Sequence, residues 1–141
     1  GPELPPLDYL PAGGTTHRNH ASLHAHSRSL YALWKENLVG AREIKRLMAL
    51  PGPARIYTGV RTVPKGTKVY NKTGSTARVC GDMGILSVKG LDGKWYPYTV
   101  IGIIEKERNA ANYTSWIRSR GNIIRDVSSI VYQSIAQNHN I

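Results

Sequence analysis

The sequence predicts an α+β fold in which an antiparallel sheet of about three strands packs against helices. Residues 67–106 are rich in β-branched and aromatic residues punctuated by glycines, which is typical of antiparallel strands joined by short turns. The flanking segments 17–50 and 107–141 repeat apolar residues at three- and four-residue intervals, as amphipathic helices do. All of these segments fit one domain, or part of one, in a chain of 141 residues.

Composition excludes several classes of protein. With 40% hydrophobic and 20% charged residues, the chain has enough apolar surface to offset the entropy of ordering, so it is not wholly disordered. Charge or glycine interrupts every hydrophobic run before the roughly 18 residues that a membrane helix needs. The single Cys80 excludes an internal disulfide framework and a Cys-rich zinc site. The formal net charge of +10 predicts attraction to polyanions such as nucleic acid, anionic lipid or an acidic cell-wall polymer.

The first 16 residues are expected to form an irregular lead-in. Residues 1–16 hold four prolines and three glycines, which oppose regular hydrogen-bonded structure. Because the chain begins Gly1-Pro2 without a methionine or a basic-then-apolar leader, we expect these two residues to be a cleavage scar.

Two helices in tandem are expected to follow. Asn19 or Ser22 can cap the first helix, which runs to about Glu36. The second spans about 41–50 and is stopped by Pro51. Their apolar stripes consist of Leu23, Leu30, Leu33 and Trp34 in the first helix and Ile44, Leu47 and Met48 in the second.

A connector and three strands come next. Residues 51–66 form the connector, because Pro-Gly-Pro and Pro-Lys-Gly turn signals enclose a short apolar Ile56-Tyr57. The strands are expected near 67–77, 82–90 and 94–105. Asp-Gly at residues 92–93 readily adopts the positive φ of a tight primed turn, so the second and third strands should be neighbours.

The last predicted element is one long helix over about 109–137, in which Gly121 is a mild weak point. Helices on one face of a three-stranded sheet leave the other face poorly covered and both edges open. We therefore expect the isolated chain to self-associate, completing its sheet with another copy or with a missing part of the domain. The apolar stripe of this predicted helix consists of Tyr113, Trp116, Ile117, Ile124, Val127, Ile130, Val131 and Ile135.

The motif Asn71-Lys72-Thr73-Gly74-Ser75 lies inside the first predicted strand rather than in a loop. It matches the K-T-G element of penicillin-recognising serine enzymes. A three-residue match is frequent by chance, and the alternative is an exposed strand end where Lys blunts an edge and Gly introduces a bulge. The order of connector, motif-bearing strand, hairpin, apolar strands and long terminal helix is much harder to obtain by accident.

With its elements in this order, the chain resembles the C-terminal part of class A β-lactamase-like serine hydrolases and penicillin-binding enzymes. The resemblance lies in the segment from Lys68 to Leu86 and in the helix from Trp116 to Ile135. The resemblance implies a β-lactamase-like fold, no metal and no organic cofactor.

The resemblance also implies roles for four residues. Lys72 would place positive charge beside a catalytic serine and bind a substrate carboxylate. Thr73 would offer its hydroxyl to the same carboxylate, and Gly74 would let substrate approach the strand closely. The backbone N–H of Ser75 would be one oxyanion-hole donor. Lys72 and Ser75 are thus the candidate catalytic residues, and all four are candidate substrate-binding residues.

Two of the three signature elements of this family are absent from the chain. No Ser has a Lys three positions later, and no S-D-N tripeptide occurs. We therefore expect the C-terminal portion of a longer protein, whose N-terminal part carries the serine. That parent would act on a β-lactam or a peptide amide or ester through an acyl-enzyme, in the periplasm or outside the cell. The isolated chain would be inactive.

A second reading is a non-catalytic basic module for binding or assembly. In it, Trp95 and Tyr98 beside Lys and Arg side chains would engage a polyanion such as nucleic acid. In the hydrolase reading nucleic acid is not an expected partner. Tyr96 belongs to the same strand, where one face should pack and the other should be wet.

The remaining candidates have ordinary structural alternatives. Glu3, before Leu7-Asp8, could be a relic of the acidic loop that activates water in class A enzymes, although its spacing differs. Arg78 and Arg108 could add charge beside Lys72 or be solvated.

Cys80, without a partner, is expected to be a packing residue. His17, His20, His24 and His26 lack an H-E-x-x-H pattern, so we favour solvated histidines over a metal site.

Overall fold

A computed structural model of the chain describes residues 21–141. The predicted lead-in, the Gly1-Pro2 scar and the proposed role of Glu3 lie outside the described residues. The elements, in chain order, are α1 (Leu23–Trp34), α2 (Ala41–Met48), β1 (Lys68–Ser75), β2 (Val79–Lys89), β3 (Trp95–Glu105) and α3 (Tyr113–His139).

The three strands form one antiparallel sheet in the order β1-β2-β3, as predicted. The first pairing runs from Lys68 opposite Ser87 to Ser75 opposite Cys80. The central strand, β2, begins three residues before the predicted position. The N–H of Thr76 donates to the carbonyl of Val79 at 2.8 Å, so a tight turn closes earlier than expected.

The hairpin between β2 and β3 lies where it was predicted, but its turn has another geometry. Strand pairing ends at Lys89 opposite Trp95, which leaves five residues, 90–94, in the loop. Only Gly93 has a positive φ in this loop, of 79°. The carboxylate of Asp92 accepts from the N–H of Lys94 at 2.9 Å, an Asx-type contact that stabilises the turn in place of a second left-handed residue.

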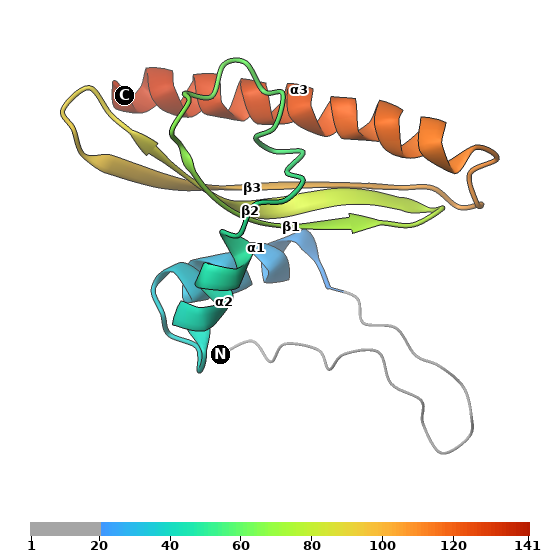
Figure 1. The fold of residues 1–141 in the computed structure, drawn as a ribbon, viewed down its shortest axis with the longest axis horizontal. Helices are drawn as coiled ribbons and strands as arrows, with labels where there is room; N and C mark the ends of the chain where they lie inside the picture. The colour runs from blue at the N-terminus through green and yellow to red at the C-terminus, as the bar shows by residue number, and fades with distance from the viewer. Residues whose placement is uncertain (1–20) are drawn as a thin grey trace.

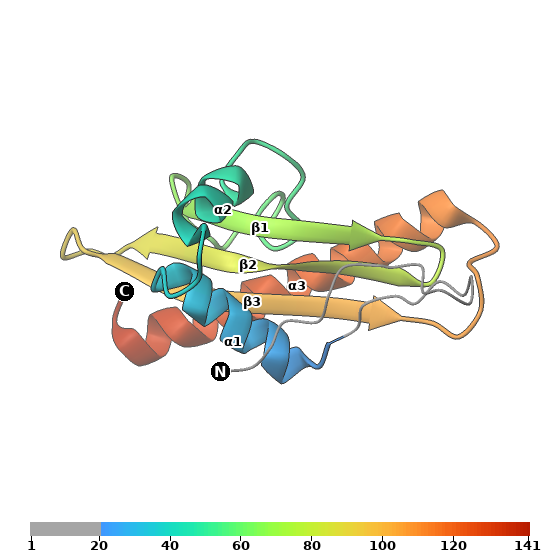
Figure 2. The same cartoon turned by 90° about the horizontal axis from the view of Figure 1, so that it is seen from below.

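Helices cover both faces of the sheet, so the prediction of a single covered face is wrong. Figure 1 shows α3 along one face, and α1 and α2 on the other; Figure 2 shows the same arrangement from below. The reason lies in β2, which is buried almost continuously. Because successive residues point to opposite faces, Ile85 faces α1 while Leu86 packs in the core beneath α3.

The hydrophobic core lies between α3 and the sheet, and the connector contributes to it. Residues 51–66 hold no helix or strand, as predicted, yet Ile56 is completely buried. The core consists of Ile56, Val60, Val63, Cys80, Leu86, Val88, Tyr98, Val100, Trp116 and Ile124.

The helix boundaries follow local capping. The hydroxyl of Ser22 accepts from the N–H of Ala25 at 3.1 Å and so caps α1. The last helix starts at Tyr113 rather than 109, because the preceding segment is tied to the β1–β2 turn. The N–H of Ala110 donates to Ala77 O at 2.8 Å in that segment. Asn112 then caps α3 by accepting from the N–H of Ser115.

Among residues 21–141, no helix has both the length and the apolar character that crossing a bilayer requires.

The open edges of the sheet predict self-association. Within the described residues, β1 and β3 each pair on one side only, and β3 is 11 residues long. Unpaired N–H and C=O groups on a long edge strand are a template for another strand. We expect the mass measured by light scattering to rise with protein concentration. A constant monomeric mass over a wide dilution range would contradict this prediction.

Candidate functional site

The four predicted site residues lie together at the end of β1, an edge strand in the described part of the chain. Because side chains alternate along a strand, that of Lys72 lies on one face of the sheet and those of Thr73 and Ser75 lie on the other. The predicted placement of the motif on a strand is therefore confirmed.

A pocket of about 170 Å³ adjoins this strand end. Lys72, Thr73 and Gly74 line it, and Ser75 lies just beyond it. His26 of α1 also lines the pocket, with its Nδ1 3.0 Å from the carbonyl of Ser22. The other lining residues are Val79, Gly81, Asp82, Met83 and Ile103.

The ammonium group of Lys72 is available to an anionic ligand. Its Nζ donates to the neighbouring Thr73 carbonyl at 2.7 Å, and the side chain is exposed. The salt bridges found within residues 21–141 all lie around α1 and α2, so no described carboxylate forms a salt bridge with Lys72. An ammonium group that forms no salt bridge is free to attract the carboxylate of a ligand.

Arg55 fixes the strand end that carries Gly74 and Ser75. Its Nη2 donates to Ser75 Oγ at 2.6 Å. Its Nη1 donates to the carbonyls of Gly81 at 2.7 Å and Gly74 at 3.3 Å. The guanidinium fork thus joins β1 to β2 and adds a second cation beside the motif. Sequence reasoning missed Arg55, because an arginine in a turn-rich connector has no local signal.

Asp82 is a buried carboxylate that ties the connector to the sheet. It is 2% exposed. Its Oδ2 accepts from the N–H of Ile56 and its Oδ1 from Nδ2 of Asn71, each at 3.0 Å. Burial raises the pKa of Asp82, and the hydrogen bonds from Asn71 and from the connector backbone oppose that rise. Sequence reasoning did not single out this residue.

Asp82→Asn is expected to be less stable than the native chain. Both carboxylate oxygens of Asp82 accept from N–H groups, and in the variant an amide nitrogen, itself a donor, would replace one of these oxygens. The raised pKa means that the native state binds the proton of Asp82 more readily than the unfolded chain does. That contribution is complete below the ordinary pKa of 3.8 and is lost as pH rises through the raised value. The stability advantage of the native chain over Asp82→Asn should therefore shrink as the pH rises above about 4 in urea unfolding. An advantage that grows with pH would contradict this.

The other candidate residues lie outside this pocket. Nε of Arg78 donates to Oδ1 of Asn109 at 3.0 Å, and Arg108 is exposed in the loop before α3. Cys80 is fully buried, its thiol lies 3.8 Å from the carbonyl of Ile117, and burial raises its pKa. Cys80 is therefore a packing residue, as predicted.

The histidine cluster divides at the boundary of the described residues. His17 and His20 lie outside them, His24 is exposed, and His26 lines the Lys72 pocket. In the part of the chain from residue 21 onward, no three His, Cys, Asp or Glu side chains gather as a metal site would require.

The aromatic platform of the alternative reading does not form as that reading requires. Trp95 is 41% exposed, but Tyr98 is 9% exposed and packs near Tyr132 of α3. Burial raises the pKa of Tyr98. The prediction for β3 is thus confirmed. Trp95 lies on its more exposed face, and Tyr98 lies on its packed face.

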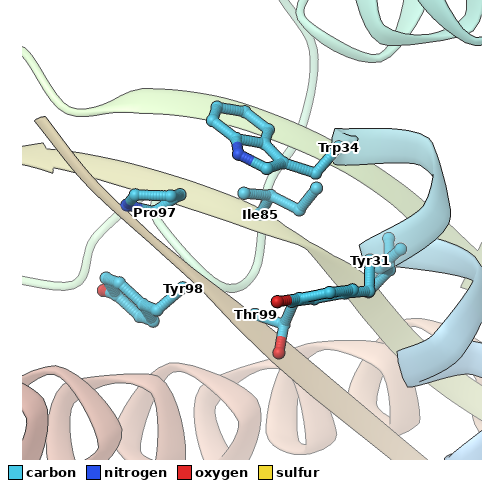
Figure 3. Close-up of a pocket in the computed structure, with 7 residues that line it drawn as sticks. Tyr31, Trp34, Ile85, Pro97, Tyr98 and Thr99 are labelled. Carbon is cyan, nitrogen blue, oxygen red and sulfur yellow. The ribbon is translucent and has the colours of Figure 1, made fainter. Parts of the chain in front are cut away.

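A second pocket, of about 200 Å³, lies between α1 and the sheet. Figure 3 shows Tyr31 and Trp34 reaching from α1 towards Ile85, Pro97 and Thr99 of the strands. Its walls are mainly apolar, and no carboxylate, lysine or histidine lines it. The lining of the Lys72 pocket is also mainly apolar, but it includes Lys72, His26 and Asp82.

No protein-family model and no curated protein matches the chain. Among solved structures, PBP-A has the same fold, with a TM-score of 0.61 and 19% sequence identity. A mutant of PBP-A, in an acyl-enzyme complex with penicillin G, gives a TM-score of 0.60 at 19% identity. Both matches cover 89% of this chain and 42% of the matched chain.

The match shows the fold and not the activity, because so few residues are identical. The chain has the fold of part of PBP-A. It spans less than half the length of the structures that it matches. The predicted α+β, β-lactamase-like fold is confirmed.

Proposed function

We propose that this chain supplies the substrate-binding strand of a β-lactamase-like serine hydrolase, whose nucleophilic serine lies on a segment outside it. The observation that carries the proposal is the K-T-G-S segment at the end of β1, where unpaired Lys72 borders a small pocket on a fold shared with PBP-A. The substrate class is a β-lactam or a peptide amide or ester.

The binding roles follow from the chemistry of acyl transfer. A substrate carboxylate seated at the unpaired edge of β1 is attracted by Lys72 from one face of the strand and accepts from the hydroxyl of Thr73 on the other face. A base outside this chain takes the proton of the serine hydroxyl as the serine oxygen attacks the carbonyl carbon of the substrate, and this proton later passes to the leaving group. The π electrons of the carbonyl move onto its oxygen, and the N–H of Ser75 donates to that oxyanion. The C–N or C–O bond then breaks, the leaving group takes a proton, and water later hydrolyses the acyl-enzyme.

The geometry around Gly74 and Ser75 supports close approach of a substrate. No atom lies within 4 Å of the position that a Cβ on Gly74 would take. Arg55 holds the carbonyl of Gly74 and the hydroxyl of Ser75, which keeps the following backbone in one orientation. An oxyanion donor that is already oriented costs no reorganisation when charge develops.

The hydroxyl of Ser75 is not the nucleophile in this proposal. Its oxygen accepts from Arg55, and a guanidinium remains protonated, so it cannot serve as a base for the hydroxyl proton. The sequence also lacks S-x-x-K and S-D-N. We therefore infer that the isolated chain binds substrate without cleaving it.

Acylation of the full-length parent and of this chain, compared side by side, tests the proposal. Each is treated with a fluorescent penicillin and with a serine-reactive fluorophosphonate, and the products are read by intact mass. Labelling of the parent alone is expected. Absence of label from both would overturn the hydrolase proposal, and label on the isolated chain would overturn the placement of the nucleophile.

We also propose a periplasmic or extracellular location, which follows from the family that the sequence resembles. Fractionation of cells that produce the full-length protein tests it, and recovery from the cytoplasm alone would contradict it.

A further inference from the structure

We propose that the hairpin end of the sheet, opposite the Lys72 pocket, docks on an anionic lipid surface. The hairpin-end patch consists of Lys68, Lys89, Leu91, Lys94 and Trp95. This inference is independent of the proposed enzyme function.

The patch projects from the molecule. Figures 1 and 2 both show the β2–β3 hairpin extending beyond the helices at one end of the sheet. Leu91 in its loop is 97% exposed, and Trp95 at the start of β3 is 41% exposed. Two large apolar side chains are thus presented on a protruding hairpin, where a planar surface can reach them.

Lysines surround the exposed tryptophan. Nζ of Lys68 lies 4.2 Å from the centre of the Trp95 ring, and Nζ of Lys89 lies 6.0 Å from it. Lys94 is exposed in the same loop. Asp92 is the acidic residue of the loop, and its carboxylate accepts from the hydroxyl of Tyr96 and the N–H of Lys94. Cationic groups therefore dominate the patch.

The combination fits a lipid surface better than a dissolved polyanion. Lysines bind anionic headgroups, a tryptophan favours the interface, and an aliphatic side chain gains by leaving water for the acyl boundary. A polyanion offers nothing to a fully exposed Leu91. Single-stranded nucleic acid would need free stacking faces, but Lys68 lies over Trp95 and Tyr98 is buried.

Docking at this end leaves the candidate site open. β1 starts at Lys68 beside the hairpin and ends at Ser75, so the patch and the Lys72 pocket lie at opposite ends of the same strand. A molecule seated on lipid through the patch keeps the strand end that carries Gly74 and Ser75 away from the bilayer.

The test is co-sedimentation of the chain with vesicles of phosphatidylglycerol and phosphatidylcholine, compared with phosphatidylcholine alone. We expect binding to the anionic vesicles that weakens as salt rises. Leu91→Ser should weaken binding about tenfold, because a leucine no longer enters the interface. Lys68→Gln and Lys89→Gln should each weaken it about fivefold.

Matched control variants distinguish the effect of the patch on vesicle binding from the effects of net charge and of apolar exposure elsewhere. Val39→Ser removes another fully exposed aliphatic side chain, and Lys35→Gln and Arg118→Gln remove exposed cations elsewhere. These variants should bind like the native chain, and circular dichroism verifies that every variant is folded.

Three results would overturn the proposal. The first is equal binding to anionic and neutral vesicles. The second is an equal loss of vesicle binding in patch and control variants. The third is vesicle binding that Leu91→Ser leaves unchanged, together with tight binding of single-stranded DNA. The last would identify a polyanion as the partner of this surface.

Discussion

Lys72→Ala in the full-length protein is expected to lower the second-order rate constant for acylation by penicillin at least about 100-fold. Lys72 is the lysine that borders the pocket at the end of β1, and it forms no salt bridge with a described carboxylate. Removing it takes away both the attraction for the substrate carboxylate and the positive charge near the reacting groups. Stopped-flow measurement with a fluorescent penicillin gives the rate constant directly.

Lys68→Ala is the matched control. Lys68 lies four residues earlier on β1 and on the same face, but at the hairpin end. It removes the same charge from the same strand without touching the pocket. Acylation should remain within about twofold of the native rate. Equal losses in the two variants would show that net charge, and not the position of Lys72, governs the reaction.

Gly84→Ala is expected to destabilise the fold by about 3 kcal/mol or more. Gly84 lies on the central strand opposite Asn71. A Cβ on Gly84 would overlap the carbonyl oxygen of Tyr70 and approach the Cα of Asn71 to 2.8 Å. Because both obstacles are backbone atoms of β1, the strand must move away, and Lys72 moves with it.

Gly74→Ala provides the comparison for stability. A Cβ there meets no atom within 4 Å, so its free energy of unfolding should stay within about 0.5 kcal/mol of the native value. Urea unfolding of the two variants measures the difference. If Gly84→Ala were as stable as the native chain, the close approach of β1 and β2 at this position would be wrong.

The elements of this fold were predictable because their signals are local. Three strands, a turn at Asp92-Gly93 and a long last helix follow from residue type and spacing within short windows. The K-T-G motif was placed on a strand by the same reasoning. The patterns in these short segments did not reveal that helices cover both faces of the sheet. A continuously buried strand such as β2 lacks the simple alternation of apolar and polar residues.

The surroundings of the motif were not predictable, because long-range contacts form them. Arg55 lies 20 residues before Ser75, and Ile56 lies 26 residues before Asp82. Neither contact leaves a pattern in the chain, and His26 likewise reaches the pocket from another element.

Amphipathic spacing has a further limit, which α2 shows. The spacing correctly identified one apolar side of this helix, but Ile44 and Leu47 on it are 42% and 50% exposed. Periodicity states that a face is apolar, and it does not state what covers that face.

The most direct test of the central claim is a titration of the isotopically labelled chain with penicillin G, followed by amide NMR and intact mass. The account predicts chemical-shift changes concentrated at Lys72, Thr73, Gly74 and Ser75, with no covalent adduct. Chemical-shift changes confined to the pocket between α1 and the sheet, which Tyr31 and Trp34 line, would contradict it. An acyl adduct on this chain would also contradict it.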